Sequence, residues 1–182
     1  MIEWIIIAII VLILIITISY HNRFVVLSNR IDNSLSQINV QLKRRADLIP
    51  NLIETVKGYA KHEKSIMTEV TKARKALVSA KGLVGKVKAN NILEGALGKL
   101  FAIAENYPDL KANTNFIELQ RELSSTEDRV AYARQNYNDS ILTYNNIVQK
   151  FPGSIFAGMF GRKVKEYIQI APAEKKTPKV SF

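Results

Sequence analysis

The sequence predicts an all-α protein in which an N-terminal transmembrane helix continues into an antiparallel bundle of long helices. Two observations support this fold class: an uncharged apolar run over residues 4–20, and an apolar stripe over residues 30–60. The stripe recurs in steps of three and four, a spacing that keeps side chains on one face of a helix and that no β-strand could keep. Such a stripe requires partner helices. Its members are Ile31, Leu35, Ile38, Leu42, Ala46, Ile49, Ile53, Val56 and Ala60.

The apolar run is expected to be an uncleaved, single-span anchor in a lipid bilayer, with residues 1–21 as its domain. As a helix it would extend about 25 Å, close to the thickness of a bilayer core once its flanks are added. Trp4 and Tyr20 bracket it where aromatic side chains favour the membrane interface, and Ile10 and Leu14 lie within it. A cleaved signal peptide fits less well, because no Lys or Arg precedes the run and no A-x-A site follows it.

Flanking charge predicts the orientation of this anchor. Arg23 and Arg30 follow the span closely, whereas nothing basic precedes it. The positive-inside rule then places the body in the cytoplasm, at the cell membrane. Because Ala8 is the only small apolar residue of the span, the span carries no small-xxx-small pair that would specify a tight dimer.

The first helix of the body is expected to run from about Asn22 to Ala80. Pro50 should kink it, since proline removes a backbone donor and clashes with the preceding turn, while the stripe stays in phase across it. If the helix instead restarts there, Asp47 could cap the new helix. The elements expected to follow are a turn at Gly82, Gly85 and Asn90–Asn91, a shorter helix over 93–104, a third helix over about 115–150, and a short apolar helix over 154–161.

The expected lengths of the helices do not match one another. The first helix would be about 88 Å long, the third about 54 Å and the second about 24 Å, so part of the stripe would stay uncovered. We therefore expect apolar surface of the first helix to meet other subunits or the membrane, and a homo-oligomer to form.

The formal net charge of +10 is concentrated in two regions. Residues 43–88 hold twelve Lys and Arg against four Asp and Glu, and the last 21 residues hold six against two. Clustered basic charge suits anionic lipid headgroups or a protein partner, and equally suits a solvated helix face. Nucleic acid is not the expected partner, because aromatic residues do not interleave with the lysines. The candidate anion or partner contacts are Lys43, Arg44, Arg45, Lys57, Lys61 and Lys64.

The sequence assigns no catalytic, cofactor-binding or metal-binding residue. The absence of cysteine excludes disulfides, thiolate nucleophiles and thiolate metal sites. His62-Glu63 lacks the second histidine of a zinc-protease motif, since Ile66 stands there, and His21 is the only other histidine. The acidic residues of the third helix are expected to pair with Lys and Arg on a solvated face: Glu118, Glu122, Glu127 and Asp128.

Arg44 and Arg45 allow two interpretations. Either could fork onto a partner carboxylate or a phosphate. Alternatively, both brace the first helix against the third while Asp47 pairs or caps locally, and this bracing interpretation is favoured. Tyr137 and Tyr144, seven residues apart and so on one helix face, are expected to pack between helices.

A family resemblance is carried by VQLKRRADLIPNLIETVKGYAKHE, NYPDLKANTNFIELQREL, STEDRVAYARQNYNDSILTYNNIVQKFPG and the terminal PKVSF. From Asn22 onward the chain resembles the bacterial LemA family. The resemblance implies a single-pass membrane protein with a four-helix bundle-like body, and it brings no catalytic residue. The motif positions it carries are Arg44, Arg45, Asp47, Pro50, Asn51, Tyr107, Pro108, Asp109, Leu110, Tyr137, Asn138, Asp139, Tyr144 and Asn145.

The function expected from these features is that of a membrane-anchored, non-enzymatic helical scaffold that self-associates at the bacterial cell membrane and presents a basic face. The alternative is an adaptor or regulator that docks a partner protein or an anionic lipid through residues 43–88. The expected domains are the anchor over 1–21, the helical bundle over 22–170 and a basic C-terminal tail over 171–182.

Overall fold

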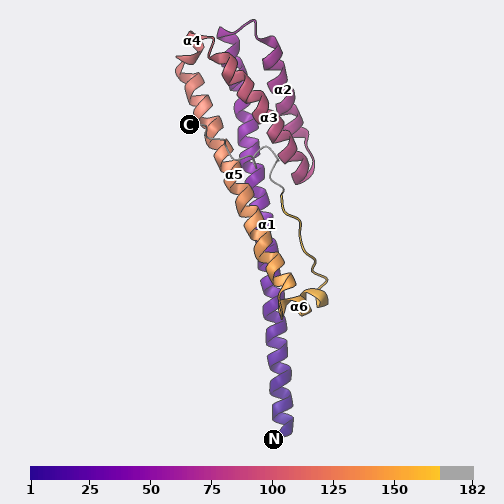
Figure 1. The fold of residues 1–182 in the computed structure, drawn as a ribbon. Helices are drawn as coiled ribbons and strands as arrows, with labels where there is room; N and C mark the ends of the chain where they lie inside the picture. Colours follow the sequence, from indigo (N-terminus) through magenta and orange to yellow (C-terminus); the bar gives the residue numbers. More distant parts are fainter. Residues whose placement is uncertain (169–182) are drawn as a thin grey trace, which may run out of the picture. The chain divides into compact units, whose positions relative to one another are not determined.

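A computed structural model describes residues 1–168, and over these residues the chain forms six helices and no strand (Figure 1). The all-α fold class is therefore confirmed. The predicted basic tail and the last two residues of the predicted bundle lie outside the described residues, and the predicted domain boundaries stay predictions. The helices are α1 (Ile2–Tyr59), α2 (Lys64–Ser79), α3 (Gly82–Ala104), α4 (Pro108–Lys111), α5 (Thr114–Gln149) and α6 (Gly153–Met159).

Helix α1 runs through Pro50 without a break, as the in-phase stripe predicted. Pro50 lies on the exposed face, where a missing backbone donor costs least. The helix then ends at Tyr59, so the prediction of one helix reaching Ala80 was wrong. The chain leaves the helix at Ala60 and starts α2 at Lys64. Periodicity missed this break because the buried residues of α2 resume helical spacing directly after it: Ile66, Met67, Val70, Ala73 and Leu77.

Helices α2 and α3 form a helical hairpin joined by Ala80 and Lys81. Gly82, with a φ of +68°, provides the left-handed backbone that starts α3. The predicted turn at Asn90–Asn91 and the start of the second helix at residue 93 were therefore wrong, because both asparagines lie inside α3. Asparagine is a weak helix former, but Asn90 is buried and hydrogen-bonded here, so tertiary contacts override its propensity.

The described chain divides into two compact units. Among the described residues, unit 1 comprises 1–34 and 134–168, and unit 2 comprises 35–133. In unit 2 the stripe of α1 is buried from Ile38 to Ala60, against apolar side chains that the other helices of the unit supply. The buried residues that α2, α3, α4 and α5 add to this unit include Val70, Leu77, Leu93, Leu97, Leu100, Leu110, Phe116, Leu123 and Val130.

Unit 1 has its own core around Phe24, which is fully buried. Leu27 and Ile31 continue the stripe there, against Ile141 and Tyr144 of α5. Thus the stripe of α1 is covered within the chain in both units. The stripe is therefore not left open to other subunits, contrary to what the helix lengths had predicted, because α2 is a separate helix and α3 is longer than expected. The homo-oligomer stays a prediction.

The predicted short apolar helix is present as α6, and it packs on the segment of α1 that follows the apolar run. Tyr20 stacks on Phe156 with ring centroids 4.6 Å apart, and His21 meets Phe160 edge-on at 5.0 Å. Gly153, which starts α6, is buried against the backbone of Ile147. These contacts fix α6 at the level of residues 20–24 of α1.

Helix α1 is the one helix among residues 1–168 that is long and apolar enough to cross a membrane. No residue of its most apolar 18-residue window is buried by the rest of the chain. Trp4, Ile10 and Leu14 are all exposed. An apolar helix that no part of its own chain covers fits a lipid environment, as the predicted anchor requires.

We expect Gly153→Ala to loosen α6, because an added Cβ would overlap the carbonyl oxygen of Ile147 and lie 3.1 Å from its Cγ2. Overpacking of this kind costs about 1–3 kcal/mol. Gly158→Ala is the matched control, since its Cβ would meet nothing within 4 Å. Hydrogen exchange of residues 153–160 in the full-length protein in detergent measures the effect, and equal protection in both variants would contradict it.

Candidate functional site

Arg44 and Arg45 are neighbours in sequence but have opposite environments in unit 2. Arg45 is buried, donates a hydrogen bond to Asn90 Oδ1 on α3 at 3.0 Å, and forms an ion pair with Glu127 on α5. Arg44 is about half exposed and pairs with Glu122 on α5 at 2.8 Å. Both arginines thus brace α1 against α5, as the favoured interpretation held, and two of the predicted acidic face residues are their partners.

Burial determines what Arg45 can do. Removal from water lowers the pKa of Arg45 below its usual value, and the nearby Glu94 opposes that shift. The usual pKa of an arginine lies so far above neutral pH that the side chain stays charged. Its Nη1 group contacts Asn90 and Glu127 inside the unit, and the side chain is buried. In this structure Arg45 is therefore not exposed for the surface contact with an anion for which it was a candidate.

A groove of about 830 Å³ lies where α1 ends and α2 begins. Its floor contains Ile53 and Met67, both buried. No Asp or Glu is among its lining residues, although Lys57 pairs with the exposed Glu54 of α1 at 2.6 Å. The groove brings together three of the predicted contacts and adds two basic residues. Its basic rim is Lys57, Lys61, His62, Lys64 and Lys72.

The sequence reasoning did not single out His62 or Lys72 as contacts. Lys72 could have been found, because Lys64, Thr68 and Lys72 follow each other at four-residue steps and so share one helix face. His62 lies in the turn between α1 and α2, which the sequence reasoning placed inside a helix.

Lys43 lies apart from this groove. It lines a separate hollow of about 360 Å³ with Asp47. The sides of that hollow are held by Arg74, which donates to the Ala46 carbonyl at 2.8 Å, and by Lys86, which donates to Asn39 at 2.7 Å. Asp47 lies in the middle of α1, so it caps no restarted helix, and the neighbouring motif residues Pro50 and Asn51 are exposed.

The motif at Tyr107-Pro108 ties together the turns at one end of unit 2. The Tyr107 hydroxyl donates to Glu63 at 2.9 Å, directly before α2, and Pro108 is the first residue of α4. The hydrogen bond, with a smaller contribution from desolvation, raises the pKa of Tyr107. Asn113 in turn donates to the Tyr59 hydroxyl at 2.9 Å. These contacts are structural, and they close the α1–α2 junction beside the groove.

Two motif asparagines in unit 1 hold an extended segment against α5. Asn145 accepts from the backbone N–H of Lys165 at 2.8 Å and donates to its carbonyl at 2.9 Å. Asn138 likewise accepts from the backbone N–H of Ile168 at 2.9 Å and donates to its carbonyl at 3.1 Å. Because the asparagines are seven residues apart, they lie on one face of α5 and imitate the pairing of a neighbouring strand. Asp139, between them, is exposed.

The two tyrosines of this motif pack differently. Tyr144 is buried against Phe24, with ring centroids 6.2 Å apart, and the ammonium of Lys165 lies over its ring at 5.4 Å. Tyr137 is half-buried, and its pKa is raised first by burial and then by the charge of Asp32. Tyr144 therefore packs between helices, as expected for both residues, and Tyr137 lies at the rim of the same core.

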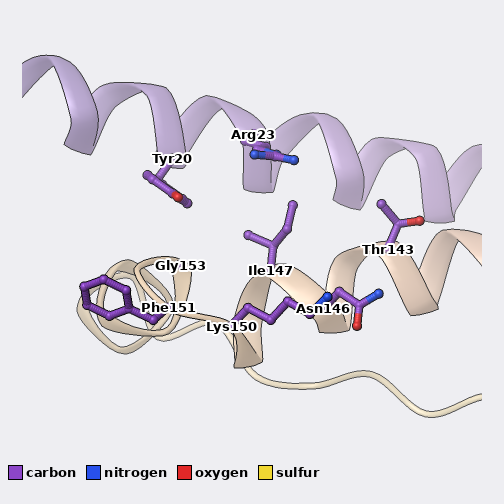
Figure 2. Close-up of a pocket in the computed structure, with 8 residues that line it drawn as sticks. All are labelled: Tyr20, Arg23, Thr143, Asn146, Ile147, Lys150, Phe151 and Gly153. Carbon is purple, nitrogen blue, oxygen red and sulfur yellow. The ribbon is translucent and has the colours of Figure 1, made fainter.

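A second, smaller hollow of about 310 Å³ lies in unit 1, where the apolar run of α1 ends (Figure 2). Tyr20 and Arg23 enter it from α1, Ile147 from α5, and Phe151 lies on the loop before α6. The hollow combines two cations with exposed apolar surface, a combination the sequence did not indicate. Its other lining residues are Thr143, Asn146, Lys150 and Gly153.

No group of three or more His, Cys, Asp or Glu side chains that could hold a metal ion occurs within residues 1–168.

An all-helical body that follows an exposed apolar N-terminal helix defines a membrane-associated helical-bundle protein. The profile of the LemA family matches residues 34–182. The chain belongs to the LemA family, as the sequence resemblance indicated.

Named relatives agree with this assignment. The chain is 30% identical over 179 residues to magnetosome protein MamQ 1 of Paramagnetospirillum magneticum and to magnetosome protein MamQ of Magnetospirillum gryphiswaldense. Each match covers 84% of this chain and 66% of the relative. Protein LemA of Metamycoplasma hominis is 27% identical over 124 residues, which cover 68% of this chain and 57% of that protein. The chain thus spans less than two thirds of the length of these relatives.

We expect Arg45→Met to lower the free energy of unfolding by about 3 kcal/mol, because it leaves Glu127 and Asn90 without their partner in a buried site. Arg44→Met, its exposed neighbour, should cost no more than about 1 kcal/mol. Urea unfolding of the full-length protein in mild detergent compares the two. Similar losses in both variants would contradict the bracing role assigned to the buried arginine.

Proposed function

We propose that this protein is a membrane-anchored, non-enzymatic scaffold that docks an acidic segment of a partner protein in the groove between α1 and α2. The observation that carries the proposal is the composition of that groove: an apolar floor at Ile53 and Met67 beneath a rim of five basic residues, with no carboxylate in its lining. Membrane association, which family membership and the exposed apolar run of α1 support, keeps this groove attached to the bilayer.

The groove suits an amphipathic helical segment. Apolar side chains of such a segment would cover Ile53 and Met67, and this burial would provide most of the binding free energy. Carboxylates on its flanks would face Lys61, Lys64 and Lys72. Charge pairs at an exposed rim add specificity and speed of association more than affinity, so the apolar floor and the basic rim have separate tasks.

Self-association at the bilayer is the competing form of the scaffold. Self-association was expected because part of the stripe on α1 would stay uncovered, but in both units the chain itself buries that stripe. The observations therefore favour docking of a different protein over docking of a second copy, and the mass of the protein distinguishes the two.

We expect an acidic amphipathic peptide, built from alternating turns of Leu and Glu, to bind the full-length protein in detergent with an affinity that falls steeply with salt. The triple variant Lys61→Glu, Lys64→Glu, Lys72→Glu should bind at least tenfold more weakly, because it reverses the charge of the rim. The triple variant Lys81→Glu, Lys88→Glu, Lys111→Glu changes net charge equally at exposed positions outside the groove and should bind nearly as wild type.

Equal losses in the two triple variants would mean that overall charge, not the groove, attracts the peptide. The mass of the peptide-free protein, measured in the same detergent by analytical ultracentrifugation, is the second readout. A large assembly that the peptide does not alter would favour self-association and contradict docking in the groove.

We also propose that the body faces the cytoplasm, a placement supported by Arg23 and Arg30 after the span. Because the chain has no cysteine, Lys81→Cys adds a single thiol at an exposed position between α2 and α3. In intact bacterial cells this thiol should resist a membrane-impermeant maleimide and react after permeabilisation. Labelling of intact cells would place the body outside. Ile2→Cys, at the other end of the span, should show the opposite pattern.

A further inference from the structure

Helix α6 is tied to α1 at the point where the apolar run ends. The Tyr20–Phe156 stack and the His21–Phe160 contact place it beside residues 20 and 21 of α1. Phe24, one turn further on, meets the same Phe160 ring at 6.5 Å. If the run ends at the boundary of the bilayer core, α6 lies at that boundary too.

Helix α6 and the loop before it also expose large apolar side chains. Phe151 is 82% exposed, Ile155 56% and Met159 63%. Ile155 and Met159 are four residues apart in α6, so they share one face of the helix, whereas Gly153 and Ala157 on the opposite face are buried. Phe151 lies on the loop directly before the helix. A short segment that exposes three large apolar side chains suits the interface of a bilayer better than water.

Cations accompany this apolar face. Arg23 of α1 and Lys150 at the end of α5 line the hollow beside Tyr20 (Figure 2). No Asp or Glu lines it, and within residues 1–168 neither cation forms an ion pair. Asn146 adds a side-chain amide that can donate hydrogen bonds. The hollow therefore combines the charges and donors that bind a phosphate group.

The depth of the hollow agrees with that ligand. Arg23 lies three residues beyond Tyr20, which is about 4.5 Å along a helix axis. The headgroup layer extends roughly 5–7 Å beyond the hydrocarbon core on each side. Arg23 therefore lies at the depth of lipid phosphates when Tyr20 lies at the edge of the core.

We propose that α6 and the adjoining hollow form a lipid-docking surface, in which Arg23 and Lys150 bind the phosphate of an anionic phospholipid while Phe151, Ile155 and Met159 enter the membrane interface. This surface belongs to unit 1 and is distinct from the groove between α1 and α2, so it does not depend on the function proposed for that groove. The protein would then be held by two contacts with the bilayer, the span and α6.

The first test measures whether α6 enters the interface. The sole tryptophan is removed by Trp4→Phe, and Phe151→Trp provides a new probe in full-length protein reconstituted into liposomes of phosphatidylcholine and phosphatidylglycerol. Lipids brominated near the headgroup should quench its fluorescence at least twofold. Val84→Trp is the matched control, because Val84 is equally exposed, at 82%, and lies outside α6. Its quenching should be clearly weaker.

The second test measures lipid preference. Each basic residue near an anionic surface contributes about a fivefold gain in binding, so Arg23→Gln with Lys150→Gln should lower the enrichment of phosphatidylglycerol over phosphatidylcholine around the protein by about tenfold or more. Lys81→Gln with Lys88→Gln removes the same charge elsewhere and should leave enrichment unchanged. Arg23→Lys with Lys150→Arg keeps both charges and should retain most of it. Native mass spectrometry of protein released from nanodiscs counts the bound lipids.

Either of two results overturns the proposal. Quenching of the Phe151→Trp variant no stronger than that of Val84→Trp would show that α6 stays out of the membrane, for instance because a second copy covers it. Equal phosphatidylglycerol enrichment in wild type and in the Arg23→Gln, Lys150→Gln variant would show that the hollow does not bind the headgroup.

Discussion

Burial of one apolar stripe on α1 is the constraint on which the rest of the structure depends. The stripe continues from Phe24 to Ala60 in steps of three and four, and each compact unit is built around its own stretch of it. In unit 2 the hairpin of α2 and α3 joins α5 in covering it, and in unit 1 α5 and α6 do so. Some polar side chains enter these cores together with a partner, as Arg45 does with Asn90 and Glu127. Hydrophobic burial sets the arrangement of helices, and the few buried polar contacts tie neighbouring helices together within it.

Much of this fold could be predicted from periodicity, because the stripe, the apolar run, α5 and α6 all show it directly. The break between α1 and α2 could not, since Ile66 and Met67 resume the same spacing and no Gly or Pro occurs between Tyr59 and Lys64. The start of α3 could not be predicted either, because a residue typical of turns lies within the helix. Asn90 looks like a turn residue, and only its contact with Arg45, far away in sequence, shows why it lies within a helix.

The candidate sites were predictable only where one stretch of sequence supplies them. Lys57, Lys61 and Lys64 lie close together along the chain, so their joint role at the groove could be inferred from charge. The hollow at the end of the apolar run draws Arg23 and Lys150 from opposite ends of the chain, and no local pattern links them. For Arg45 the local pattern was misleading. Its position in the sequence groups it with exposed cations, whereas its side chain is buried in the core.

The asparagine pairing in unit 1 has a consequence for how this part of the chain can evolve. Asn138 and Asn145 form their hydrogen bonds with the backbone of the segment they hold, and the intervening Glu166 and Tyr167 are exposed. Side chains at those two positions can therefore change without removing the hydrogen bonds that hold the segment. The asparagines themselves have no such freedom: aspartate, although nearly identical in shape, would place a second acceptor against a carbonyl oxygen where a donor is required.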